Sequence, residues 1–213
     1  MTSAQEAAQP AFNVLPFTDA PCDSTDREML AHFVGHHARP LLQRFGSLSR
    51  VLGGDAKEIE RIAGREAARM LAMIHEAAIR MTRADAYRRP VITSWSSLLA
   101  YARVQIAAEP REQFRVMFLD KKNQLIADEV MGHGTIDHAP VYPREVMRRA
   151  LELSASAVIL VHNHPSGDPT PSAADIDMTR QVVEAGRPLK VAVHDHIVVA
   201  AENIASLKAL GLF

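Results

Sequence analysis

The sequence predicts an α/β protein, a mixed β-sheet with helices on its faces, preceded by a small helical region. In the second half of the chain, short apolar runs rich in β-branched residues alternate with stretches of helical period, the order that builds layered α/β domains. Residues 24 to about 83 show helical periodicity instead. The 213 residues, of which 47% are hydrophobic and 23% charged, are enough for one or two domains with their own cores.

The chain divides into three parts by composition. Residues 1–23 are rich in Ala, Pro and polar side chains and are expected to form a flexible tail. Residues 24–90 are expected to form a helical domain, and residues 91–213 the α/β domain. Pro90 marks the linker between them, because the residue before a proline is disfavoured in a helix.

Three helices are expected before the linker. Thr25-Asp26 is a suitable helix start, and apolar residues recur behind it at helical spacing as far as Val34. A short helix is expected at 40–45 and a longer one at about 55–81. Core packing is a sufficient explanation for the Met and Ile residues of the longer helix.

Beyond the linker, helices and strands are expected to alternate. Ser94 is expected to cap a helix, Lys121-Lys122-Asn123 to turn a hairpin, and Pro143 to stand at a helix start. The expected elements are helices at 96–108, 144–153 and 173–186, strands at 113–119, 124–132, 157–162, 190–194 and 196–200, and a short tail at 206–213 packed against the sheet.

The most informative stretch follows the apolar strand 157–161. Successive side chains of a strand point to opposite faces, so His162 and His164 share a side and Asn163 points away. Together with Asp175, the two imidazoles form a possible three-point grip on a divalent metal. Three ligands of this kind leave a fourth position for water, as in catalytic zinc sites. The pattern indicates metal-assisted hydrolysis.

A simpler interpretation of the same residues remains open. Two histidines at a strand end are often only polar residues at the rim of a sheet. Ser172 and Asp175 also match a helix-capping box, which needs no metal. The two interpretations are compatible, because a capped helix start would hold Asp175 in place and the helix dipole would favour its ionised form.

The string HNHPSGDPTPS, with YPREV before it and HDH after it, resembles the RadC family of JAB-domain proteins. Within it, H-x-H, seven residues, Ser, two residues and Asp match the JAMM (MPN-plus) signature of zinc-dependent isopeptidases. The resemblance, clearest from Arg111 onward, implies a JAB/MPN fold similar to the α-β-α sandwich of cytidine deaminases. It further implies Zn²⁺ held by His162, His164 and Asp175, with Ser172 stabilising the oxyanion and an upstream glutamate activating the metal-bound water.

Three glutamates compete for the role of base. In JAMM enzymes this residue lies just before the first strand of the sheet, which is the place of Glu112. Glu129 lies in the next expected strand, and Glu145 in the first turn of a helix, where the helix dipole alone explains an acidic residue. We favour Glu112, with a rim glutamate of no catalytic role as the alternative.

Other zinc patterns are absent or weaker. His75-Glu76 begins like H-E-x-x-H but has Ile79 in place of the second histidine. The single cysteine, Cys22, excludes cysteine-rich zinc fingers, zinc deaminase sites and an internal disulfide. A second H-x-H, His194-Asp195-His196, is better explained as a strand-end pair than as metal ligands. A role behind the metal ligands or facing the substrate stays open for it.

The helical region leaves a second function open. Residues 41–48 (LLQRFGSL) resemble the helix-hairpin-helix module that precedes the JAB domain in RadC proteins, although its hairpin is shortened here to a single glycine, Gly64. Residues 36–89 contain eleven Lys and Arg against six Asp and Glu. This excess of positive charge is compatible with weak DNA binding, and equally with a helical face that is only exposed to solvent. A DNA repair or recombination role with a non-proteolytic metal site is therefore the alternative to hydrolysis of a protein or peptide substrate.

The hydropathy pattern bears on location. No run of eighteen or more apolar residues occurs, so no membrane span is expected. The first residues lack the basic and apolar regions of a secretory signal. A cytoplasmic protein with a net charge of −1 is expected.

Overall fold

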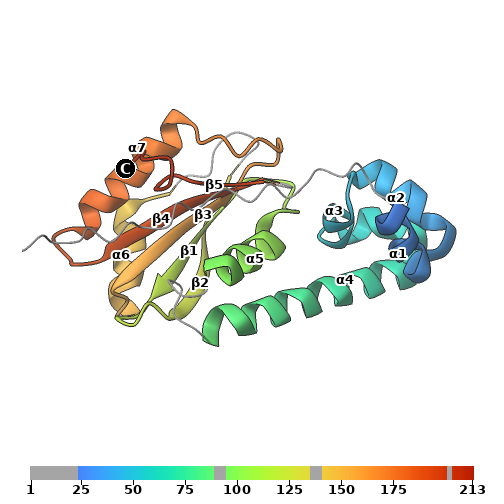
Figure 1. The fold of residues 1–213 in the computed structure, drawn as a ribbon, viewed down its shortest axis with the longest axis horizontal. Helices are drawn as coiled ribbons and strands as arrows, with labels where there is room; N and C mark the ends of the chain where they lie inside the picture. Colours follow the sequence, from blue (N-terminus) through green and yellow to red (C-terminus); the bar gives the residue numbers. More distant parts are fainter. Residues whose placement is uncertain (1–23, 89–94, 135–140, 201–202) are drawn as a thin grey trace, which may run out of the picture.

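A computed structural model describes residues 24–88, 95–134, 141–200 and 203–213 of the chain. It shows a five-stranded mixed sheet with helices on both faces, preceded by a group of helices (Figure 1). The predicted α/β class, with a helical part in front, is confirmed. The expected tail, the Pro90 linker, the Ser94 cap and Cys22 lie outside the described residues.

Eight helices and five strands are described, counting one short 3₁₀ helix. In chain order they are α1 (Ser24–Val34), η1 (Gly35–His37), α2 (Ala38–Phe45), α3 (Leu48–Leu52), α4 (Ala56–Arg88), α5 (Trp95–Ile106), β1 (Gln113–Leu119), β2 (Leu125–His133), α6 (Pro143–Glu152), β3 (Ala157–Asn163), α7 (Ala173–Gly186), β4 (Ala192–Val199) and β5 (Ile204–Ser206).

The sheet has the strand order β2-β1-β3-β4-β5. β1 pairs antiparallel with both β2 and β3, β3 pairs in parallel with β4, and β4 pairs antiparallel with β5. α7 provides the crossover between the parallel strands β3 and β4. This crossover brings the start of α7 to the end of β3, where the two histidines stand.

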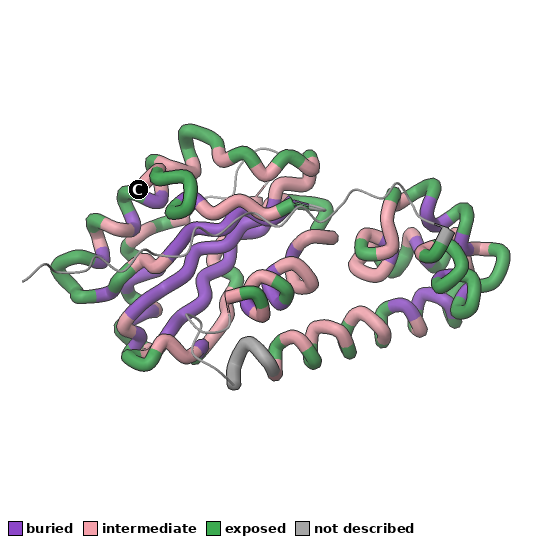
Figure 2. Tube along the Cα trace, viewed as in Figure 1, coloured by how far each residue is buried: buried purple, intermediate pink, exposed green. Residues whose placement is uncertain are grey.

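β1 and β3 are buried along their whole length, as Figure 2 shows. Their side chains alternate between two apolar layers. The layer under α6 and α7 includes Phe114, Val116, Phe118, Val158, Leu160, Val146, Met147 and Val182. The layer under α5 includes Met117, Leu119, Ile159, Val161, Leu98 and Tyr101. Burial on both faces explains why these strands appear in the sequence as continuous apolar runs.

The N-terminal helices have a core of their own. It contains Leu30, Val34, Leu41, Val51, Ile59 and Leu71, among others. α4 leads from this group to the side of α5 (Figure 1). There His75 Nε2 lies 3.0 Å from the carbonyl oxygen of Val104, and Ile79 packs against the core beneath α5. α4 therefore contributes to both cores.

Gly64 interrupts α4. Its backbone angles, φ 85° and ψ 166°, are not helical, and only glycine adopts a positive φ of this kind without strain. The single long helix expected from the apolar spacing is thus two helical segments joined at this residue, and the second one continues past the expected end at 81 to Arg88.

The other expected elements agree with the structure with a few exceptions. Pro143 is the first residue of α6, and Asn123, at φ 57°, turns the β1–β2 hairpin. The two strands expected at 190–194 and 196–200 are one strand, β4. The short elements η1, α3 and β5 were not expected. Each has three to five residues, too few for a periodic pattern.

Candidate metal centre

His162, His164 and Asp175 converge in the structure. Their ligand atoms all lie within 4.8 Å of one another. The two Nε2 atoms are 2.9 Å apart, and they lie 3.4 Å and 3.6 Å from the carboxylate oxygens Oδ1 and Oδ2 of Asp175. Tetrahedral zinc with bonds of about 2.0–2.1 Å separates its ligand atoms by roughly 3.3–3.4 Å. The two carboxylate contacts are close to this spacing and the Nε2–Nε2 distance is shorter, so the donor set fits a divalent metal of this kind once the two rings move slightly apart.

The two histidines stand at the end of β3. His162 is opposite Phe114 of β1 and next to Val198 of β4 in the ladder, and His164 is held by its N–H bond to the carbonyl of Val199. The chain then turns through Gly167, whose φ of 92° favours glycine. The side chain of His162 is 4% exposed, whereas those of His164 and Asp175 are 14% and 19% exposed, so solvent reaches the cluster at His164 and Asp175.

Asp175 is fixed by the start of α7. The expected capping box is present: Ser172 Oγ accepts from the Asp175 N–H, and the Ser172 N–H donates to Asp175 Oδ2. The Ser172 hydroxyl also donates to Oδ2 at 2.7 Å. Burial alone would raise the pKa of the Asp175 carboxyl. The neighbouring His162, His164 and Ser172 side chains outweigh it, since they stabilise the ionised carboxylate, and they hold that pKa far below its usual value. The carboxylate is therefore ionised.

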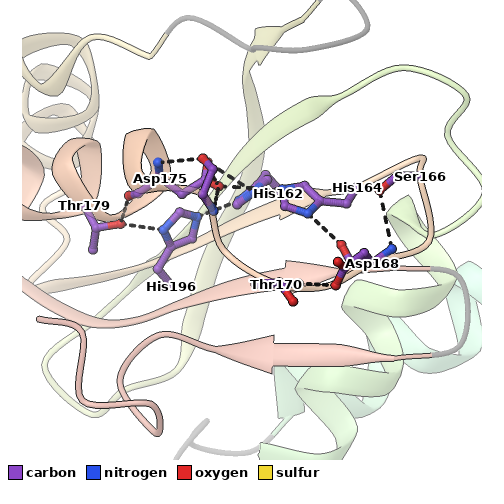
Figure 3. Close-up of polar contacts among 9 residues, drawn as sticks. His162, His164, Ser166, Asp168, Thr170, Asp175, Thr179 and His196 are labelled. Carbon is purple, nitrogen blue, oxygen red and sulfur yellow. Dashed lines mark hydrogen bonds and ion pairs between the residues drawn. The ribbon is translucent and has the colours of Figure 1, made fainter.

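The ring of His164 is oriented by the loop that follows it. Its Nδ1 lies 2.8 Å from the carbonyl oxygen of Asp168 (Figure 3). A carbonyl only accepts, so Nδ1 carries a proton and, in the neutral ring, Nε2 has a free lone pair. Once the ring is protonated, Nε2–H can donate to the Asp175 carboxylate, and this raises the pKa of His164 against the opposing effect of its partial burial.

The ring of His162 is backed by β4 and α7 rather than by a loop. Its Nδ1 lies 2.8 Å from Nε2 of His196, whose own Nδ1 lies 2.6 Å from Oγ1 of Thr179 (Figure 3). His196 and Thr179 are both 0% exposed. Burial keeps the pKa of His196 well below its ordinary value. Phe114 stacks on His162 and meets His196 edge-on.

Glu112 lies beside the cluster. It directly precedes β1. Phe114 of β1 pairs with His162 of β3 in an antiparallel ladder, and continuing this register by two residues brings Glu112 opposite His164. The negative charge of Glu112 contributes to the raised pKa of His164. The competing glutamates are engaged elsewhere: Glu129 forms a bidentate ion pair with Arg149, and Glu145 pairs with Arg148 on α6. The geometry favours Glu112 among the three.

Asn163 holds the segment that carries Glu112. This residue is 1% exposed and points away from the two histidines, as the alternation predicts. Its Oδ1 accepts the N–H of Gln113 at 2.8 Å, and its Nδ2 donates to the carbonyls of Glu109 and Arg111 at 3.0 and 3.1 Å. One side chain thus ties the approach to β1 to the strand that bears the metal ligands.

The second H-x-H does not form a comparable pair. His194 Nε2 lies 2.6 Å from Oδ1 of Asn123 in the β1–β2 turn, whereas His196 supports His162. The expectation of a strand-end pair is wrong in detail, because both residues lie inside β4.

Sequence reasoning missed Thr179 and Asn163. Thr179 stands four residues after Asp175, on the same face of α7, and this spacing was the available signal. Asn163 could have been singled out as a polar residue on the face opposite the two histidines, in a strand whose continuous apolar run indicates burial on both faces.

A comparison with known protein families found a match for the α/β part of the chain. A family model described as RadC-like JAB domain matches residues 92–212. The match includes every strand of the sheet, the three converging side chains and Glu112. Among the described residues, no helix combines the length and apolar character needed to cross a membrane.

Proposed function

The chain belongs to the RadC-like JAB domain family, and from this we propose that it is a zinc-dependent hydrolase of the JAMM type that cleaves a peptide or isopeptide bond. The observation that carries the proposal is the convergence of two imidazole Nε2 atoms and an ionised carboxylate at distances near those of tetrahedral metal ligands. When bound there by His162, His164 and Asp175, zinc would act as a Lewis acid and lower the pKa of a coordinated water to about 7.

Glu112 is the proposed general base. It would take a proton from the attacking water and pass it to the amine nitrogen as the carbon–nitrogen bond breaks, which completes a hydrolysis. Its place before β1, across from His164, and the clamp by Asn163 support this role.

Ser172 is the proposed donor to the oxyanion. It stands at the N-cap of α7 with an exposed side, next to Asp175. Its hydroxyl donates to Asp175 Oδ2 in the structure, so the hydroxyl would have to rotate toward the substrate carbonyl. A donor aimed at developing negative charge contributes roughly 10²–10³ to the rate in other hydrolases.

The first test is metal content. We expect about one zinc per chain in protein purified without chelators, measured by elemental analysis. Protein that is folded by circular dichroism and takes up no zinc from a buffered solution would refute the proposed metal site.

The second test seeks the substrate. Glu112→Gln should keep the zinc but lower turnover by roughly 10²- to 10⁴-fold. A proteome-wide comparison of new peptide termini between wild type and Glu112→Gln would reveal the scissile bond. Glu145→Gln is the matched control, because Glu145 pairs with Arg148 on the surface of α6. Equal cleavage by wild type and Glu112→Gln would assign the base elsewhere.

DNA binding through the helical region is the second proposal and has less support. The excess of basic residues favours it, but Arg44, Arg65 and Arg80 each form an ion pair with a glutamate. A gel-shift titration tests it, since phosphate contacts weaken steeply with salt. Failure to bind at about 50 mM salt would remove this function.

A further inference from the structure

We propose that Thr179 and His196 are positioning residues that fix the ring proton of His162 on Nδ1, so that its Nε2 turns a free lone pair toward His164 and Asp175. That this hydrogen-bond relay prepares His162 to bind a metal rests on the proposed function. The relay itself is argued from contacts among residues of α7, β4 and β3 (Figure 3).

The relay begins at a backbone carbonyl. Thr179 Oγ1 lies 2.5 Å from the carbonyl oxygen of Asp175, one helical turn earlier. A carbonyl cannot donate, so the single hydroxyl proton of Thr179 lies in this bond. Oγ1 can then only accept from its other partner, Nδ1 of His196, at 2.6 Å. His196 therefore carries a proton on Nδ1.

The next step concerns the charge of His196. The ring is 0% exposed, and its two hydrogen-bond partners, a hydroxyl and an imidazole, bring no negative charge. A cation buried in this way is unfavourable. The neutral ring has one proton, already placed on Nδ1, so Nε2 accepts from Nδ1–H of His162 at 2.8 Å.

The result is a matched pair of ligand atoms. His162 holds its proton on Nδ1 through the relay, and His164 holds its own on Nδ1 through the carbonyl of Asp168. Two Nε2 lone pairs then face each other at 2.9 Å. They repel each other at this distance, and a cation bound to both relieves the repulsion. Such outer partners commonly fix the tautomer of a metal-binding histidine.

Two further contacts make the relay rigid. Phe114 lies parallel to the His162 ring at 6.2 Å and edge-on to His196 at 5.6 Å between centroids, which limits rotation of both rings. Because Thr179 bonds to the backbone of Asp175, the same turn of α7 supplies one ligand and orients another.

The test compares variants of one hydroxyl. Thr179→Val keeps the shape of the side chain and removes the hydroxyl, and Thr179→Ser restores it. Thr82→Val is the matched control, because Thr82 makes the same bond to a carbonyl four residues earlier, in α4 far along the chain from the cluster. The zinc dissociation constant is measured by chelator competition. Long-range ¹H–¹⁵N spectra of the metal-free protein at alkaline pH report the tautomers of His162 and His196.

We expect Thr179→Val to weaken zinc binding by roughly 10- to 100-fold, the usual effect of losing an outer partner. Thr179→Ser and Thr82→Val should bind as wild type does. In wild-type spectra, His162 and His196 should each show a single tautomer with the proton on Nδ1, and Thr179→Val should mix the tautomers.

Two results would overturn the relay: a wild-type His162 with its proton on Nε2, or a folded Thr179→Val with unchanged tautomers and zinc affinity. If Thr179→Val does not fold, the wild-type spectra still decide. Wild type that shows the expected tautomers but binds no zinc would refute the proposed metal function and support the relay.

Discussion

The chain contains the same tripeptide pattern twice, and the structure uses the two copies differently. In His162-Asn163-His164, both rings meet at one point with Asp175. In His194-Asp195-His196, one ring supports that point and the other bonds to Asn123 at a hairpin turn. Two histidines with one residue between them therefore predict a pair of ligands only where the side chains of the strand alternate regularly between the two faces of the sheet.

A register shift separates the second pair. Val158 and Ile159 are consecutive in β3, but their partners in β4 are Val193 and Asp195, so His194 is an extra residue. A bulge of this kind resets the alternation of side chains. His196 then faces α7, on the side of Leu160, its partner in the ladder. The sequence carries no evident mark of this bulge.

The largest expected effect separates the two motifs directly. His162→Ala or His164→Ala should weaken zinc binding by at least about 1000-fold, since losing only an outer partner already costs roughly 10- to 100-fold. His194→Ala should leave the zinc affinity unchanged, because His194 bonds only to Asn123 among its described hydrogen bonds. Chelator competition on the three folded variants measures this. Equal losses in all three would mean that zinc binds elsewhere.

Part of the site could be predicted from the sequence because it depends on local geometry. The alternation of a strand places His162 and His164 on one side, and the capping box that fixes Asp175 spans only four residues. The partners of His162 could not be predicted in this way. His196 reaches it only because β4 lies beside β3, and adjacency of strands is a property of the whole sheet.

The fold shows the same limit. The runs that form β1 and β3 are buried on both faces and were recognisable as strands. The length of α4 was underestimated because its second half packs against α5, a contact that apolar spacing within the helix does not show. Gly64 divides α4 where the sequence resembles a shortened hairpin, and its positive φ explains why the helix breaks there.

A second prediction compares Asn163, the middle residue of the first motif, with Asn123, the hydrogen-bond partner of His194 in the second. Asn163→Ala should lower the free energy of unfolding by about 2–3 kcal/mol, because the N–H of Gln113 and two carbonyls lose a buried partner. It should also lower hydrolysis while zinc stays bound, since the segment carrying Glu112 is released. Urea unfolding, zinc content and turnover are the measurements.

Asn123→Gly is the control for that variant. Glycine tolerates the φ of 57° at this turn, so mainly the bond to His194 is lost, at a cost of about 1 kcal/mol or less. Turnover should not change. If Asn163→Ala hydrolyses substrate as fast as Asn123→Gly, the clamp on the Glu112 segment is not needed for catalysis.

The smallest expected effect is on the pH dependence of stability, to which His194 and His164 should contribute with opposite signs. Burial, with a contribution from the charge of Lys208, lowers the pKa of His194, whereas the bond to Asp175 raises that of His164. Below about pH 6.5 the unfolded chain binds a proton at His194 that the folded protein resists, so this contribution is full above that pH and is lost as pH falls. For His164 the contribution is full below about pH 6.5 and is lost as pH rises through the raised folded value.

Metal-free protein makes this difference measurable. Urea unfolding between about pH 5 and 8 should show that His194→Asn flattens the loss of stability on the acid side, relative to wild type. His164→Asn should instead flatten the loss on the alkaline side. If both variants change the same limb of the profile, the two histidines do not differ in environment as the burial of His194 and the carboxylate beside His164 imply. The two motifs would then differ in where their histidines lie and not in how their surroundings shift the histidine pKa.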